Sequence, residues 1–260
     1  MSDLMSYLFE TNAIRFCEEN KPFWYTSGKI GPYFINTHFV YGSEADAANL
    51  LSFIDDNKHN KLGMPKNLFA KVKEQYENNK IYNDVVNEMV EFIKNNINVD
   101  EIDYISGGER RDWFFSYMAS NILNKPHITI FKDLDAVVSD ANFENTEVAK
   151  EIKGMKVLHI ADLMNQASSY IRAWIPAIQN LGGELVWSTV IVDRVQGGKE
   201  RLEDLGIKSL SIASIDESLF QTAFEKGIIN EAQLDMVHNF IKDPDGSMRA
   251  FLVAHPEFLE

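Results

Sequence analysis

The stretch that decides the fold is KVLHIADLMNQASS, residues 156–169. Residues 157–160 form a short, mostly apolar run of strand-favouring residues, which predicts a buried strand. Asp162 follows this run, then a polar loop at residues 165–169, and a helical pattern begins at Tyr170. The stretch therefore predicts a strand, a loop and the start of a helix.

A buried parallel strand that delivers an acidic residue and small polar residues to a helix N-terminus can bind a phosphorylated sugar. Hydroxyls and backbone N–H groups hold the phosphate, and the carboxylate holds the ribose hydroxyls. The alternative is an ordinary strand-to-helix turn in which Asn165 or Ser168 caps the helix. These residues alone leave both interpretations open.

The composition is that of a folded protein with an acidic surface. The chain has 260 residues, enough for one large domain with or without an appendage. It carries 39 acidic against 25 basic residues, a formal net charge of -14. Most of such a surface repels a phosphate backbone, so we expect no nucleic-acid partner.

Cysteine and histidine usage limits the chemistry. Cys17 is the single cysteine, which excludes an intramolecular disulfide and favours a reducing compartment. It lies in an apparent amphipathic helix at residues 3–19, where a buried packing role is expected. The six histidines show no metal-ligand spacing, so we expect no protein-built metal site. With no secretory leader pattern and no run of eighteen apolar residues, we expect a cytoplasmic protein without a membrane partner.

Strands and helices alternate from residue 102 to residue 192, which predicts a parallel sheet with ligands at the carboxyl edge of its strands. The expected strands are 102–106, 127–131, 157–160 and 185–192, with a last one at 210–212. Chemistry-bearing residues expected at that edge are Gly107, Lys132, Asp162 and Arg194. Gly107 and Gly108 would let a ligand approach the backbone, with Arg110 and Arg111 meeting pyrophosphate; the alternative is a tight turn with solvated charges.

The flanking segments have their own patterns. Residues 23–36 predict two short strands, or one strand with a bend, around a turn that contains Lys29. Tyr33 and Phe34 are expected either in the core or with one ring stacked on a planar ligand. Residues 43–98 predict packing helices, and two further helices are expected at 217–226 and 231–241. Weak periodicity from Asp133 to Lys150 predicts a mobile loop.

Three segments resemble the type I phosphoribosyltransferases, most closely the orotate phosphoribosyltransferases. They are TSGKIGPYFIN at 26–36, VLHIADLMNQASS at 157–169 and VDRVQGGKE at 192–200. The first is similar to the family's N-terminal hood, the second to its phosphoribosyl pyrophosphate loop, and the third to the segment whose arginine meets the carboxylate of the base. The resemblance covers about residues 10–40 and 100–216.

The resemblance implies an α/β fold, with a parallel sheet flanked by helices, a small N-terminal hood and a helical C-terminal extension. It divides the chain into a phosphoribosyltransferase-like domain at 1–216 and an extension at 217–260. Within the first part the hood takes about 10–40, the helical segment 43–98 and the core 100–216.

The family's reaction transfers phosphoribose from phosphoribosyl pyrophosphate to orotate or a related base in pyrimidine nucleotide synthesis. The resemblance thus implies a nucleobase or nucleotide and phosphoribosyl pyrophosphate as small-molecule partners, magnesium bound through the ligand, and a homodimer. It implies catalytic roles for Asp162 and Lys132. Residues matched to phosphoribosyl pyrophosphate binding are Gly107, Gly108, Arg110, Arg111, Lys132, Asp162, Ser168 and Ser169. Those matched to the base are Lys29, Tyr33, Phe34, Asn165 and Arg194.

The chain departs from the family in the groups that favour turnover. Ala161 replaces an acid, Ala167 a glycine and Thr26 a lysine; Asn165 and Gln166 replace two threonines, and the lid region 133–158 has no histidine. If residue 167 needs a positive φ, alanine costs on the order of 1 kcal/mol there. These changes favour slow or absent chemistry on orotate. Two alternatives stay open: a weak or inactive nucleobase- or nucleotide-binding regulatory protein, and a phosphoribosyltransferase for another base.

Overall fold

A seven-stranded mixed sheet forms the centre of the computed structural model, which describes residues 3–18, 21–25 and 28–259. The strand order is β11-β10-β9-β5-β6-β7-β8. Five strands run parallel, whereas β7 and β8 are antiparallel to their neighbours. The α/β fold is confirmed, with a mixed rather than a wholly parallel sheet. The strands are β5 (Tyr104–Gly108), β6 (His127–Ile130), β7 (Ala136–Ser139), β8 (Thr146–Val148), β9 (Lys156–Met164), β10 (Glu184–Asp193) and β11 (Lys208–Ser214).

The segment from Asp133 to Lys150 forms the β7–β8 hairpin, so the predicted mobile loop is wrong. The carboxylate of Asp140 accepts three backbone N–H bonds within the turn. Phe143 is fully buried, and its ring stacks on Tyr117 with 4.5 Å between centroids. Strands this short show little periodicity, and Phe143 is anchored by a residue distant in sequence. The local sequence therefore predicts neither the strands nor the contact well.

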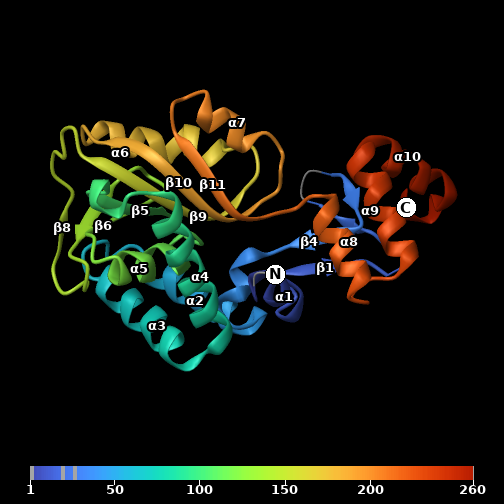
Figure 1. Ribbon diagram of the computed structural model, residues 1–260, viewed down its shortest axis with the longest axis horizontal. Helices are drawn as coiled ribbons and strands as arrows, with labels where there is room; N and C mark the ends of the chain where they lie inside the picture. The colour runs from blue at the N-terminus through green and yellow to red at the C-terminus, as the bar shows by residue number, and fades with distance from the viewer. Residues whose placement is uncertain (1–2, 19–20, 26–27, 260) are drawn as a thin grey trace.

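Helices cover both faces of the sheet (Figure 1). The predicted helices of residues 43–98 are confirmed, and with α5 they lie on one face; a single turn of π-helix, α6 and α7 lie on the other. In the described part of the chain, no helix has both the length and the apolar character that a membrane span needs. The helices are α2 (Glu44–Asn57), α3 (Met64–Asn78), α4 (Lys80–Asn96), α5 (Trp113–Ile122), the π-turn (Tyr170–Trp174), α6 (Ile175–Asn180) and α7 (Gly198–Glu203). Short 3-10 turns are η1 (Thr37–Tyr41), η2 (Val99–Glu101) and η4 (Pro256–Leu259).

The N-terminal hood contains fewer helical residues than the sequence predicts. Helix α1 spans only Asp3–Glu10, and β1 (Ile14–Phe16) pairs antiparallel with β4 (Tyr33–Ile35). The predicted helix over 3–19 is therefore wrong beyond Glu10, because cross-strand pairing overrides the helical spacing. Cys17 is buried as predicted, at 3% exposure, but its N–H bonds to the carbonyl of Pro32 rather than within a helix.

The two short strands predicted within residues 23–36 are present as β2 (Phe23–Trp24) and β3 (Ile30–Gly31), which pair antiparallel. Thr26 and Ser27, which belong to the predicted turn between them, lie outside the described residues.

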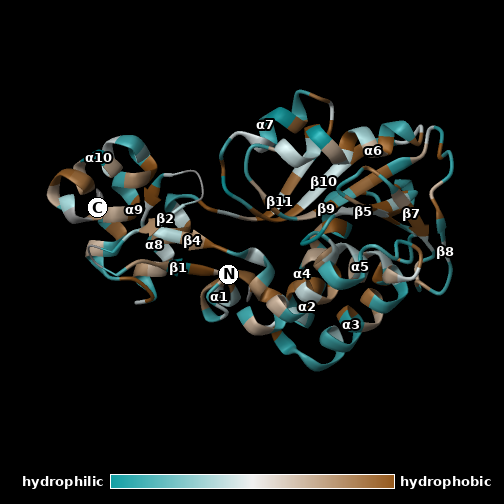
Figure 2. Cartoon of the chain, turned by 180° about the vertical axis from the view of Figure 1, so that it is seen from behind, coloured by the Kyte–Doolittle hydropathy of each residue, from teal (hydrophilic) through white to brown (hydrophobic). Residues whose placement is uncertain are grey.

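The C-terminal helices pack on the hood, away from the sheet (Figures 1 and 2). They are α8 (Glu217–Glu225), α9 (Glu231–Lys242) and α10 (Pro244–Ala254), of which α10 was not predicted. The ring of Tyr33 lies 5.0 Å from that of Phe220 and 5.8 Å from that of Phe240. Apolar residues of α8 and α9 thus belong to the same core cluster as those of the hood. The division of the chain at residue 216 stays a proposal.

The packing of α8 on the hood generates a stability prediction. Phe220→Ala should lower the free energy of unfolding by about 3–5 kcal/mol, because the fully buried ring would leave a cavity against Phe16 and Tyr33. Urea denaturation followed by circular dichroism measures the change. Val253→Ala, at an 84% exposed position of α10, is the control and should change stability by less than about 0.5 kcal/mol. An equally small change for Phe220→Ala would mean that α8 does not belong to the core.

Candidate functional site

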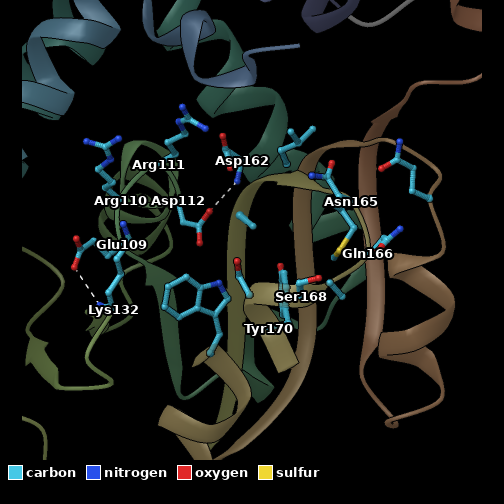
Figure 3. A pocket seen from close by; sticks show the side chains of 17 residues that line it. Glu109, Arg110, Arg111, Asp112, Lys132, Asp162, Asn165, Gln166, Ser168 and Tyr170 are labelled. Atoms are coloured by element: carbon cyan, nitrogen blue, oxygen red, sulfur yellow. Dashed lines mark hydrogen bonds between the residues drawn. The ribbon is translucent and has the colours of Figure 1, made fainter. Parts of the chain in front are cut away.

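A pocket of about 510 Å³ opens at the carboxyl ends of β5 and β9, where parallel strands place ligand sites (Figure 3). Its walls come from the loop before α5, Lys132 after β6, the end of β9 with the loop that follows, and Gln196 after β10. Seven residues predicted from the sequence line it together: Arg110, Arg111, Lys132, Asp162, Asn165, Ser168 and Ser169.

The loop after β9 presents polar side chains that are free to bind a ligand. Asn165, Ser168 and Ser169 are exposed, and in the described part of the chain their side chains form no hydrogen bond. The helix-capping alternative is therefore wrong. Arg201 holds the loop by donating to the carbonyl of Gln166 at 2.9 Å. With N–H groups of the first helical turn beside them, the hydroxyls suit a phosphate.

Ala167 has a φ of +54°, so the loop does need a left-handed residue at the position where the family has glycine. Its methyl group is buried, and the chain accepts a strain on the order of 1 kcal/mol at this point. The loop keeps the backbone path that glycine would allow.

One arginine of the pair is engaged in an ion network that joins the pocket lining to α2. Arg110 pairs with Asp55 at the end of α2. Lys58 lies 2.9 Å from Asp55 and 3.1 Å from Glu109, joining α2 to the loop before α5. The Glu109–Arg110 peptide bond is cis. The second oxygen of Glu109 accepts the backbone N–H of Lys132 at 3.1 Å.

The other two basic residues have unpaired charges. Among the described residues, the side chains of Arg111 and Lys132 form no ion pair, and both line the pocket. Arg111 comes from the loop before α5 and Lys132 from the residues after β6, and both lie across the pocket from Ser168 (Figure 3). An anionic group entering the pocket would therefore not have to break an ion pair to contact either cation.

Asp162 is the buried carboxylate of the pocket. It is 8% exposed, and burial together with the neighbouring charge of Asp112 raises its pKa to about 7, against the opposing effect of Arg111. Its backbone N–H donates to Asp112 at 3.2 Å.

Asp112 is a lining residue that the sequence did not single out. Its carboxylate accepts the N–H groups of Gly108 at 3.1 Å and of Asp162, and it lies 3.4 Å from Nε2 of His159. Nδ1 of His159 in turn lies 2.9 Å from the hydroxyl of Ser106. The one signal in the sequence was its place at the end of Glu109–Asp112, directly after a strand and two glycines. Other lining residues missed from the sequence are Glu109, Tyr170, Trp174 and Gln196.

The two glycines of β5 are buried, and neither lines the pocket. A Cβ on Gly107 would lie 2.2 Å from Oγ of Ser116, and one on Gly108 2.3 Å from the ring of Trp174. Their small size serves internal packing, and a ligand contact by either glycine stays a prediction.

Four residues predicted to meet the base lie outside the pocket lining. Lys29 pairs with Asp245 of α10 at 2.8 Å, Tyr33 is buried against Phe220, and Phe34 is half-buried beside Phe23. Burial raises the pKa of Tyr33 while Arg194 lowers it, so the guanidinium faces the hood. Nε of Arg194 is buried without a hydrogen-bond partner in the described part of the chain. The structure brings Tyr33 and Arg194 together, and their role stays a prediction.

No group of three or more His, Cys, Asp or Glu residues that could hold a metal ion occurs within 3–18, 21–25 and 28–259. The pocket carboxylates could still contact magnesium that enters on a phosphate ligand, because magnesium accepts one or two carboxylates together with substrate oxygens. The residues present therefore fit an ion carried by the ligand.

Comparisons with known proteins place this pocket in context. No family model matches the chain. The orotate phosphoribosyltransferase of Sulfolobus acidocaldarius is 27% identical over 164 residues, which cover 62% of this chain and 76% of that protein. That of Sulfurisphaera tokodaii is 31% identical over 139 residues, covering 54% and 66%.

Among solved structures, the orotate phosphoribosyltransferase of Francisella tularensis superposes with a TM-score of 0.59 at 14% identity, covering 92% of this chain and 98% of that one. UMP synthase of Leishmania donovani gives 0.60 at 19% identity, and this chain spans 42% of its length. The fold is therefore that of the type I phosphoribosyltransferases. More narrowly, the chain is similar to orotate phosphoribosyltransferases, which confirms the resemblance found in its sequence.

The packing of Trp174 over β5 generates a second stability prediction. Gly108→Ala should destabilise the protein by about 1–3 kcal/mol, because the added methyl group overlaps the indole ring. In a Trp174→Ala background the same change should cost clearly less, and urea unfolding of the four proteins gives the coupling. Strictly additive effects would show that the ring is not what excludes a side chain at residue 108.

Proposed function

We propose that the protein binds phosphoribosyl pyrophosphate together with magnesium and transfers phosphoribose to orotate or a related base, at a rate below that of an ordinary enzyme. The observation that carries this proposal is the loop of residues 165–169. Its free hydroxyls lie at a helix start beside the buried carboxylate of Asp162. Across the pocket lie Arg111 and Lys132, which form no ion pair among the described residues.

The residues suit the parts of such a ligand. Ser168 and Ser169 would hold the 5′-phosphate, Asp162 the ribose hydroxyls, and Arg111 with Lys132 the pyrophosphate. Magnesium bound through the pyrophosphate would neutralise charge on the leaving group. Arg111 and Lys132 would act in the same direction, and Asp162 would face the positive charge that grows on the ribose ring. Asn165 and Arg194 would orient the base.

The test is calorimetric titration with phosphoribosyl pyrophosphate, orotate and orotidine monophosphate, each with magnesium, followed by a turnover assay. We expect phosphoribosyl pyrophosphate to bind and orotate turnover to fall well below the rate of about 10 s⁻¹ that is typical of enzymes. The lost family groups at Ala161 and Thr26 and in the lid would each have stabilised the transition state, and such losses commonly cost tenfold or more. Failure to bind phosphoribosyl pyrophosphate would refute the proposal, and turnover near 10 s⁻¹ would refute the expected loss of rate.

A second candidate is a nucleobase- or nucleotide-binding regulatory protein on the same fold. It is favoured by the apolar Ala161 at the pocket and by the base side, where Tyr33 and Arg194 remain close together. The titrations separate the two: binding of orotidine monophosphate or orotate with no turnover on any base supports this candidate. Turnover on another base supports a phosphoribosyltransferase of different specificity.

Arg194 should decide whether the base is anionic. A charge-assisted contact to a carboxylate is worth about 1.5–3 kcal/mol, so Arg194→Ala should weaken orotate binding by about ten- to a hundredfold. Lys199→Ala is the matched control: it removes a positive charge from the same segment, where Lys199 lies 3.9 Å from Glu203, and should leave the affinity unchanged. Equal effects of the two variants would argue against a direct contact.

We also propose a cytoplasmic homodimer, on the strength of the resemblance. The apolar residues along 43–98 supply little for an interface, because residues such as Leu50, Ile54 and Met89 are buried in the core. Light scattering at micromolar concentration should give twice the mass of one chain, 29.7 kDa. A mass of one chain would contradict the dimer.

A further inference from the structure

The carboxylate of Asp55, in the last turn of α2, lies among three basic side chains, two of which line the pocket. It pairs with Arg110 and lies 2.9 Å from Lys58. Its pKa is lowered first by the hydrogen bond from Lys58, and then by the charges of Arg110, Lys58 and Lys132, against the opposing effect of burial. Asp55 therefore faces the cations that an anionic ligand would meet at this end of the pocket.

Arg110 is the residue for which Asp55 and such a ligand would compete. It lines the pocket, yet it pairs with Asp55 and its side chain extends away from Ser168 (Figure 3). The side chains of Arg110 and Asp55 are 32% and 38% exposed, so packing does not lock either of them. An arginine side chain has enough rotamer freedom to turn from one anion to another nearby.

The frame of the pocket does not depend on the contact between Asp55 and Arg110. Lys58 lies 3.1 Å from Glu109, whose side chain is only 6% exposed. The second oxygen of Glu109 accepts the backbone N–H of Lys132 at 3.1 Å. These contacts join α2 to the loop before α5 and to the residue after β6, and they remain when Arg110 leaves Asp55.

We propose that Asp55 is an internal competitor for the pyrophosphate group, which holds Arg110 until a bound anion draws the guanidinium toward Arg111 and Lys132. This inference rests on the proposed function and adds a regulatory contact to the same site. A half-exposed ion pair contributes little stability. Pyrophosphate carries more charge and more acceptor oxygens than a carboxylate, so it can displace Asp55 from Arg110.

The test is a double-mutant cycle on pyrophosphate binding. Inorganic pyrophosphate is titrated by calorimetry into the wild type, Asp55→Asn, Arg110→Gln and the double variant, in EDTA so that no metal contributes. Asp55→Asn should bind pyrophosphate about two- to fivefold more tightly, because Arg110 no longer has to leave an ion pair. In the Arg110→Gln background the same change should have little effect, because the competition concerns Arg110.

Asp56→Asn is the matched control. It removes the same charge from the next residue of α2, which is exposed and forms no ion pair within the described part of the chain. Its effect on pyrophosphate affinity should be much smaller than that of Asp55→Asn. An equal gain in Asp56→Asn, or a gain that persists in full without Arg110, would mean that only long-range charge matters and would overturn the inference.

Asp55→Ala serves as a second variant, because it removes the carboxylate without adding a donor, and it should give the same gain. Unchanged pyrophosphate affinity in both Asp55 variants would overturn the inference. Ribose 5-phosphate is the control ligand, since its phosphate is expected on Ser168 and Ser169. Its affinity should not respond to Asp55→Asn, and a gain as large as that for pyrophosphate would count against the proposal.

Phosphoribosyl pyrophosphate with magnesium separates this inference from the proposed function. A wild type that binds phosphoribosyl pyrophosphate but shows any of these contrary results, or binds no pyrophosphate in EDTA, overturns this inference alone. If neither the wild type nor Asp55→Asn binds phosphoribosyl pyrophosphate, the proposed function is overturned as well.

Discussion

The pocket depends on the carboxylate of Asp112, which accepts N–H groups from the ends of two neighbouring strands. Gly108 ends β5, Asp162 lies near the end of β9, and His159 approaches the same carboxylate from within β9. Burying a carboxylate costs several kcal/mol unless donors surround it, so this arrangement is stable only when all these groups are in place. These hydrogen bonds fix the carboxyl ends of β5 and β9 relative to each other, where the ligand pocket opens.

Because of this constraint, the substitutions at Ala161 and Ala167 need not abolish ligand binding. Ala161 removes an acid from β9, but the loop before α5 places the carboxylate of Asp112 between the ends of β5 and β9. Ala167 adopts a φ of +54°, so the phosphate loop keeps its path although glycine is absent. The pocket therefore keeps groups that can bind a ligand, in a different arrangement. The lysine missing at Thr26 and the histidine missing from the lid have no evident replacement among the described residues. Binding of a ribose phosphate can persist where the rate of transfer falls.

The sequence predicted the elements that carry strong local patterns. Apolar runs gave the strands of the parallel core, and the polar residues after β9 gave most of one pocket wall, because strand ends and loops are set by nearby residues. It failed where a distant contact decides: Ile14–Phe16 pairs with β4 instead of extending a helix, and Phe143 anchors the β7–β8 hairpin. Asp112 was missed for the same reason, since it accepts the N–H of Asp162, 50 residues further along the chain.

A crystal structure with phosphoribosyl pyrophosphate and magnesium bound tests the central claim most directly, because the claim concerns where each part of the ligand lies. The account places the 5′-phosphate on Ser168 and Ser169, the ribose on Asp162, and the pyrophosphate toward Arg111 and Lys132. A ligand bound with its phosphate away from the loop after β9, or with its ribose out of reach of Asp162, would contradict it.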